Sequence, residues 1–131
     1  MKLSLLPPTF AICRLDPLDA IPVWALTGSF FTITRTDEEL SIVCEEAVID
    51  PEHGMTHIKI EPGWRCLKLN GPIPFETIGV IASLTKALAD AGLSVSPIAT
   101  YDTDYLFVKE DRVPNAIRAL KNAGHEVLGA P

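Results

Sequence analysis

The sequence lacks any apolar run long enough to cross a membrane, because no stretch approaches the roughly 20 residues that a spanning helix needs. It also lacks the features of a secretory signal. The first ten residues, MKLSLLPPTF, carry one lysine and only a few apolar residues before Pro7 and Pro8. We therefore expect no membrane partner and predict a cytoplasmic protein.

Basic residues are scarce. The chain has 11 Lys and Arg against 17 Asp and Glu, which gives a net charge of −6, and the basic residues do not cluster. A nucleic-acid-binding protein presents a basic face to the phosphates. The composition therefore predicts that no nucleic acid is a partner.

Cysteine is also sparse. Cys13, Cys44 and Cys66 are odd in number and lie in apolar, strand-like segments. Buried free thiols in a reducing compartment explain this pattern more simply than a disulfide framework does.

Motifs of catalysis, nucleotide binding and metal binding are missing. The glycines form neither a dinucleotide-binding fingerprint nor a P-loop, and no nucleophile elbow surrounds Ser83. His53 and His57 have the HxxxH spacing of some zinc sites, but they straddle Gly54, lack the glutamate of HExxH and have no evident third ligand. We therefore interpret that segment as a solvated loop. We expect a protein that is not an enzyme, with no catalytic residue, no cofactor and no metal.

The chain does have enough apolar residues for a core: 131 residues, 47% hydrophobic, with a mean hydropathy of +0.24. The second half predicts the order βαββαβ. The elements are a strand over 65–70, a helix from Pro74 to Asp90, strands over 93–100 and 104–109 around a turn at 101–103, a helix from 111 to 123, and a strand over 125–128. Right-handed crossovers would place both helices on one face of a four-stranded antiparallel sheet.

The first half contains weaker copies of the same elements. A strand is predicted over 10–15, and a proline-interrupted stretch over 16–26 replaces the long helix. A hairpin follows, with strands over 30–35 and 40–44, and the second helix is short or missing. Shifted by 65 residues, this hairpin overlies the second one, with Asp37 on Asp102, Glu39 on Asp104, Leu40 on Tyr105 and Val43 on Val108. We interpret the match as an internal duplication, with a degenerate unit at 1–61 and a complete unit at 62–131.

Five segments carry a resemblance to a known family: WALTG at 24–28, TITRT at 32–36, ELSIVC at 39–44, GVIASL at 79–84 and TYDTDYL at 100–106. With them the chain resembles the ACT domains of the aspartokinase-type group. It is similar to small bacterial tandem ACT proteins and to the eukaryotic cytosolic arginine sensors (CASTOR-like). The resemblance implies an α+β fold of two ferredoxin-like units and a non-catalytic regulatory protein. It also implies an amino acid held at an ACT–ACT interface, a homodimer, and a regulated protein partner.

The resemblance also implies which residues bind the ligand. The loop that enters the long helix contributes Glu76, Thr77, Ile78, Gly79 and Val80; the strand–turn segment contributes Thr100, Tyr101, Asp102, Thr103 and Asp104; the first unit contributes Thr32, Ile33 and Thr34. A helix N-terminus suits an α-carboxylate, and glycine permits close approach of the backbone. Asp104, at the start of a strand, could pair with an α-ammonium group.

Other interpretations stay open. Asp102 fits a turn residue that bonds its own backbone better than a ligand-binding residue. Pro72 and Pro74 stiffen the loop and disfavour arginine as the ligand. The chain could also be a protein-interaction subunit with a vestigial site, or an unrecognised enzyme, because the ferredoxin-like fold hosts many chemistries.

Overall fold

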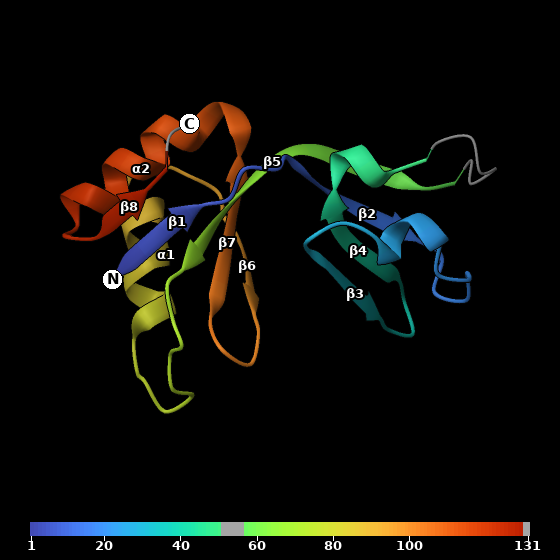
Figure 1. The fold of residues 1–131 in the computed structure, drawn as a ribbon, viewed down its shortest axis with the longest axis horizontal. Helices are drawn as coiled ribbons and strands as arrows, with labels where there is room; N and C mark the ends of the chain where they lie inside the picture. Colours follow the sequence, from blue (N-terminus) through green and yellow to red (C-terminus); the bar gives the residue numbers. More distant parts are fainter. Residues whose placement is uncertain (51–56, 130–131) are drawn as a thin grey trace. The chain divides into compact units, whose positions relative to one another are not determined.

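The computed structural model describes residues 1–50 and 57–129, which form two compact units. Unit 1 consists of Met1–Pro7 and Arg65–Pro131, and unit 2 consists of Pro8–Trp64. One strand, β5 (Lys59–Leu69), contributes its first half to unit 2 and its second half to unit 1 (Figure 1). Each unit has its own hydrophobic core.

Unit 1 contains the predicted βαββαβ order. After β5 come α1 (Val80–Asp90), β6 (Ser96–Ala99), β7 (Asp104–Lys109), a 3-10 turn η3 (Glu110–Arg112), α2 (Val113–Asn122) and β8 (Glu126–Leu128). Both helices lie on the same side of the strands (Figure 1). Leu84 and Leu88 of α1 and Leu120 of α2 share a buried cluster with Leu67 of β5 and Leu106 of β7. The predicted α+β class with helices on one face is confirmed.

Strand β1 (Lys2–Leu5) was not predicted from the sequence. It pairs antiparallel with β5 and parallel with β8, so the strand order in unit 1 is β6-β7-β5-β1-β8. The sheet of unit 1 therefore has five strands among the described residues, where four were expected, and one of its pairs is parallel. Four residues before two prolines carry little local signal, and both partner strands lie far away in the sequence.

The position of β1 also changes the division of the chain. From the sequence, residues 1–61 were expected to form one unit, whereas Met1–Pro7 belong to the compact unit that contains residues 65–131. Leu3 and Leu5 of β1 are buried in the core of unit 1. Strand β1 belongs to unit 1 because it pairs with Leu67–Leu69 of β5 and with Glu126–Leu128 of β8.

Helix α1 starts later than the sequence predicted. It begins at Val80 instead of Pro74, after Gly79 with φ +86°, and residues 74–79 form a loop. Ile78, which the helical period had placed on the buried face, is 96% exposed. The cause is local, because a left-handed residue at Gly79 separates Ile78 from the helix.

Unit 2 is a smaller antiparallel sheet in the order β3-β4-β2-β5. Its other strands are β2 (Phe10–Leu15), β3 (Phe31–Arg35) and β4 (Leu40–Glu45). In place of two helices, the described part of this unit has only the 3-10 turns η1 (Val23–Leu26) and η2 (Glu46–Val48). Trp24 and Ala25 of η1 are buried against β2 and β4. The expected shortening of both helices in the first half is thus found in the described residues.

The two β-hairpins correspond at an offset of 64 residues, not 65. Strand β4 at 40–45 matches β7 at 104–109, and η2 at 46–48 matches η3 at 110–112. Arg35 pairs with Leu40 where Ala99 pairs with Asp104. The one-residue error in the sequence alignment matters, because a slip of one residue exchanges the two faces of a strand.

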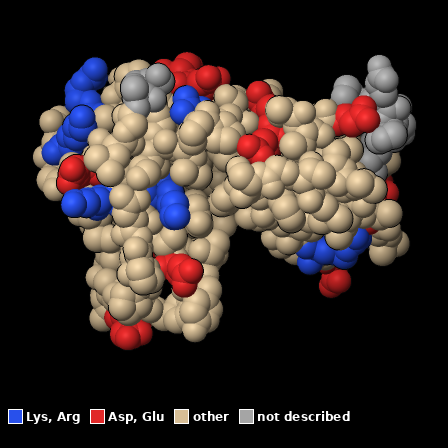
Figure 2. Space-filling view, in the orientation of Figure 1, with Lys and Arg blue, Asp and Glu red and all other residues tan. Residues whose placement is uncertain are grey.

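The three cysteines are free and buried, as predicted. Cys13 and Cys44 belong to the core of unit 2, and burial raises the pKa of Cys66 to about 12. On the face drawn in Figure 2, most of the surface is uncharged, and the acidic and basic side chains lie in small scattered groups, some of them next to each other. Among the described residues, neither α-helix is long and apolar enough to cross a membrane.

Candidate functional site

A cavity of about 280 Å³ lies in unit 1 between the loop that leads into α1 and the hairpin β6–β7. The residues around it come from two short segments of the chain. They are Ile73, Pro74, Phe75, Thr77, Gly79, Val80, Ile81, Ala82, Ala99, Thr100, Tyr101, Thr103 and Asp104. Most of them are apolar, and Asp104 is the acidic residue among them.

Hydrogen bonds fix the loop against the hairpin. The N–H of Ile73 donates to the carbonyl of Asp102 at 2.7 Å, and the buried hydroxyl of Thr103 donates to the carbonyl of Leu69 at 2.7 Å. The hairpin turn is closed by Thr100, whose N–H and hydroxyl both donate to the Thr103 carbonyl, at 2.9 and 3.0 Å. Both walls of the cavity are therefore held by bonds that need no ligand.

The N-terminus of α1 opens into this cavity. Gly79 precedes the helix, and the first turn contains no acidic residue and no side-chain cap. The unpaired N–H groups of a first turn, together with the helix dipole, make a positive end. With no carboxylate in the turn to compensate it, this end can receive an anionic group.

Asp104 lies on the opposite wall. It is the first residue of β7 and is half-buried. At the mouth, the rings of Phe75 and Tyr101 meet edge to face with centroids 4.9 Å apart. These two side chains are 70% and 80% exposed. The cavity thus has a positive end, a carboxylate and an apolar rim.

The structure brings together seven of the residues expected at the ligand site: Thr77, Gly79, Val80, Thr100, Tyr101, Thr103 and Asp104. Glu76 and Asp102 line a neighbouring depression, together with Pro72 and Pro74. Ile78 points into solvent. Thr32, Ile33 and Thr34 lie on β3 of unit 2, where the first two are half-buried and Thr34 is exposed.

Several lining residues were not among the expected ligand contacts: Ile73, Pro74, Ala82 and Ala99. Ile73 and Pro74 are apolar although they lie in a loop, and this feature of the sequence could have marked them as cavity-lining residues.

The matches to family models follow this geometry. Residues 59–122, which include the whole cavity, match the model of the ACT domain. This part of the chain belongs to the ACT-domain family. A second model, which describes an N-terminal domain, matches residues 8–52 and thus most of unit 2.

Curated relatives of this ACT-domain protein include subunit 1 of the cytosolic arginine sensor for mTORC1 from Bos taurus and Homo sapiens. Each is 32% identical over 59 residues, which are 44% of this chain and 18% of the relative. The chain therefore spans only about a fifth of the length of the curated relatives it matches.

Solved structures extend the comparison to almost the whole ACT-domain chain. A protein of Agrobacterium tumefaciens is 38% identical with a TM-score of 0.87, covering 97% of this chain and 91% of that one. The ligand-free regulatory subunit of aspartate kinase from Thermus thermophilus shares the fold, with a TM-score of 0.64 and 16% identity over 92% of this chain and 96% of that one. The names of two of these relatives state a role, one that of a sensor and the other that of a regulatory subunit.

Proposed function

We propose that this ACT-domain chain is a non-catalytic regulatory protein that binds an amino acid in the cavity of unit 1. The observation that carries the proposal is the pairing of an uncompensated helix N-terminus with a carboxylate across one cavity. An α-amino acid presents the complementary charges, a carboxylate and an ammonium, on the same carbon. The names of the arginine sensor and of the aspartate kinase regulatory subunit support a regulatory role.

In the proposed complex, the α-carboxylate accepts hydrogen bonds from the N–H groups that open α1, next to Gly79. The α-ammonium group pairs with Asp104. The hydroxyls of Thr77 and Thr100 lie among the lining residues and can contact the same polar atoms. Glu76 and Asp102, in the adjacent depression, would contact only a ligand that extends beyond the cavity.

The lining favours an uncharged ligand side chain. Ile73, Val80, Ile81 and Ala99 form apolar surface, and Asp104 already serves the α-ammonium group in the proposed complex. A cationic side chain such as that of arginine would need a second carboxylate, and the described lining contains none. We therefore expect a small aliphatic or polar uncharged amino acid to bind more tightly than arginine.

The exposed rim suggests how binding could be transmitted. Phe75, Ile78 and Tyr101 are 70%, 96% and 80% exposed beside the cavity, which is unusual for large apolar side chains. We propose that a second copy of the chain covers them in a homodimer and that the ligand stabilises this arrangement, which would bias a regulated partner protein.

Three finer elements of the proposal concern the chain as a whole. The matching hairpins at a 64-residue offset support an origin by tandem duplication of an ACT unit. The assignment of Thr32, Ile33 and Thr34 to an ACT–ACT interface remains a prediction. The name of the cytosolic relative supports a cytoplasmic location.

The test is thermal unfolding of the protein in the presence of each of the twenty amino acids. A ligand at about 100 times its dissociation constant should stabilise the protein by roughly 2.7 kcal/mol. Asp104→Asn should remove this stabilisation while the variant remains folded by circular dichroism. If no amino acid changes the unfolding temperature, the alternative of an interaction subunit with a vestigial site is favoured.

Gly79 and Gly92 provide a matched pair of control variants. Both have positive φ, +86° and +74°, and a Cβ at either position would meet no atom within 4 Å. Alanine should therefore cost each about 1 kcal/mol of folding stability through backbone strain alone. Only Gly79→Ala should also weaken ligand binding. Equal binding by both variants would contradict a site at the start of α1.

A further inference from the structure

Asp16, Asp19 and His57 come together at one end of the unit 2 sheet. Strands β2 and β5 are antiparallel, with Arg14 opposite Lys59. Continued by two residues, this register places Asp16, just after β2, opposite His57, just before β5. The pairing of two strands thus unites residues about forty positions apart in the sequence, although no local motif links them.

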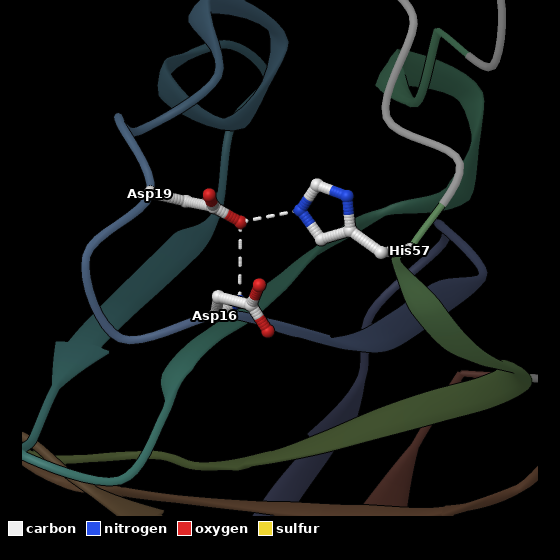
Figure 3. A group of neighbouring side chains, drawn as sticks. All are labelled: Asp16, Asp19 and His57. Atoms are coloured by element: carbon white, nitrogen blue, oxygen red, sulfur yellow. Dashed lines mark hydrogen bonds and ion pairs between the residues drawn. The ribbon is translucent and has the colours of Figure 1, made fainter.

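The donor atoms of these three side chains form a close group. One carboxylate oxygen of Asp16, one of Asp19 and one ring nitrogen of His57 all lie within 4.8 Å of one another. His57 Nε2 is 2.6 Å from Asp19 Oδ2, and the same oxygen accepts the N–H of Asp16 at 3.1 Å (Figure 3). Figure 3 shows the Asp19 carboxylate turned toward the imidazole, with Asp16 beneath it.

Besides the Asp19 carboxylate, the Arg35 side chain and a backbone hydrogen bond hold the loop that carries the two aspartates. Arg35 of β3 donates hydrogen bonds from its guanidinium to the backbone carbonyls of Pro17 and Asp19. The N–H of Asp19 donates to the carbonyl of Asp16 at 3.1 Å. Ligands held in place before binding lower the cost of binding an ion. The Arg35 charge also offsets part of the repulsion between the two carboxylates.

We propose that Asp16, Asp19 and His57 form a binding site for one divalent transition-metal ion of the zinc class. Such ions take imidazole nitrogen and carboxylate oxygen at about 2.0–2.2 Å, which sets the donors roughly 3–3.5 Å apart. The donor atoms, which all lie within 4.8 Å of one another, would have to approach one another by up to roughly 1–2 Å to reach this geometry. The imidazole of His57 disfavours calcium, because calcium takes oxygen ligands.

A simple ion pair between His57 and Asp19 does not account for Asp16. An ion pair is complete with two residues, whereas the second carboxylate, that of Asp16, adds a negative charge beside Asp19 that a divalent cation would neutralise. A metal ion would also connect the ends of β2 and β5. Unit 2 has a small core and no α-helix in its described part, and metal ligation is a common way to stabilise such units.

The test uses the full chain without any affinity tag and titrates it with ZnCl₂, by calorimetry and by thermal unfolding. We expect one bound Zn²⁺ per chain and a higher unfolding temperature. Loss of outer-shell partners alone weakens metal sites by about 10–100-fold. Asp16→Asn and His57→Gln should each cause at least that loss, and both residues are exposed, so the variants should fold.

Two matched variants exclude other sources of zinc binding. His125→Gln removes a histidine whose Nδ1 lies 3.2 Å from the Met1 amino group, an arrangement that can itself bind metal. Asp90→Asn removes a carboxylate paired with Lys86. Both should bind zinc like the parent protein. Zinc binding that survives in Asp16→Asn and His57→Gln but is lost in His125→Gln would overturn the proposal.

Cobalt provides a second readout. Co²⁺ in the proposed site has nitrogen and oxygen ligands, so its spectrum should lack the near-ultraviolet charge-transfer band of thiolate coordination. Such a band would assign the metal to Cys13, Cys44 or Cys66 and would contradict the site, as would the absence of any Zn²⁺ or Co²⁺ binding.

Discussion

At the scale of single residues, Asp102 and Asp104 stand two positions apart but have different surroundings. Asp102 is exposed in the turn, and its carbonyl accepts the N–H of Ile73, so its backbone ties the loop to the hairpin. Asp104 is half-buried and lines the cavity. The turn is closed by Thr100 and Thr103, and the expected turn chemistry thus belongs to threonines.

Thr103 offers a prediction at this scale. Its side chain is buried and donates to the carbonyl of Leu69 at 2.7 Å. Thr103→Val keeps the shape but leaves that buried carbonyl without this donor, so we expect a loss of about 1–3 kcal/mol in the free energy of unfolding. Denaturant unfolding measures it.

Thr100→Val is the control for this prediction. The Thr100 hydroxyl donates to a carbonyl that also accepts the Thr100 N–H, and the residue is exposed. We expect its cost to stay below about 1 kcal/mol. If the two valine variants lose equal stability, burial of the Thr103 hydroxyl is not what stabilises the loop.

At the scale of elements, the 64-residue offset of the hairpins aligns Asp104 with a different residue of unit 2 than the sequence alignment did. At 64 residues, Asp104 corresponds to Leu40, which is fully buried in unit 2, whereas the 65-residue alignment placed it on Glu39. Residues Ile42–Cys44 of β4 are all buried, and so are the corresponding residues Leu106–Val108 of β7. A polar residue thus occupies in unit 1 a position that unit 2 uses for its core.

This comparison predicts that replacing Asp104 by leucine raises the folding stability and abolishes ligand binding. Asp104→Leu restores the apolar residue of the corresponding strand, and replacing a functional polar residue commonly adds about 0.5–2 kcal/mol of stability. We expect a higher unfolding temperature for Asp104→Leu and no stabilisation by any amino acid. A variant less stable than the parent would show that Asp104 contributes to the fold itself.

At the scale of the whole molecule, the first residues of the chain complete the sheet that contains the candidate site. Leu3 and Leu5 are buried in the core of unit 1, and β1 lies between β5 and β8 in its sheet. Burying a leucine side chain contributes about 1.5–3 kcal/mol. Removal of residues 1–7 should therefore destabilise unit 1 by several kcal/mol.

Hydrogen exchange detected by mass spectrometry can locate this effect. In the chain that lacks residues 1–7, we expect protection to fall in β8 and in residues 65–69 of β5, and to persist in β2 and β4 of unit 2. The reverse pattern would support the division at 61 and 62 that the sequence suggested. The parent protein under identical conditions is the reference.

The local elements and the family could be predicted from the sequence. Alternation of apolar residues predicted β2 and β7 with correct bounds at 10–15 and 104–109, and the period of Leu84 and Leu88 predicted α1, because these signals are local. Resemblance, not pattern, supplied the candidate site, and seven of its residues do line one cavity. Binding of an amino acid in that cavity stays a prediction.

The features that depend on partners distant in the sequence became evident only from the fold. The membership of β1 in unit 1 rests on pairing with β5 and β8, and the hairpin offset rests on which faces are buried. The group formed by Asp16, Asp19 and His57 depends on the register of β2 and β5. This register brings the histidine close to the two aspartates of the loop. Strand pairing is a non-local interaction, so single-sequence periodicity carries no information about it.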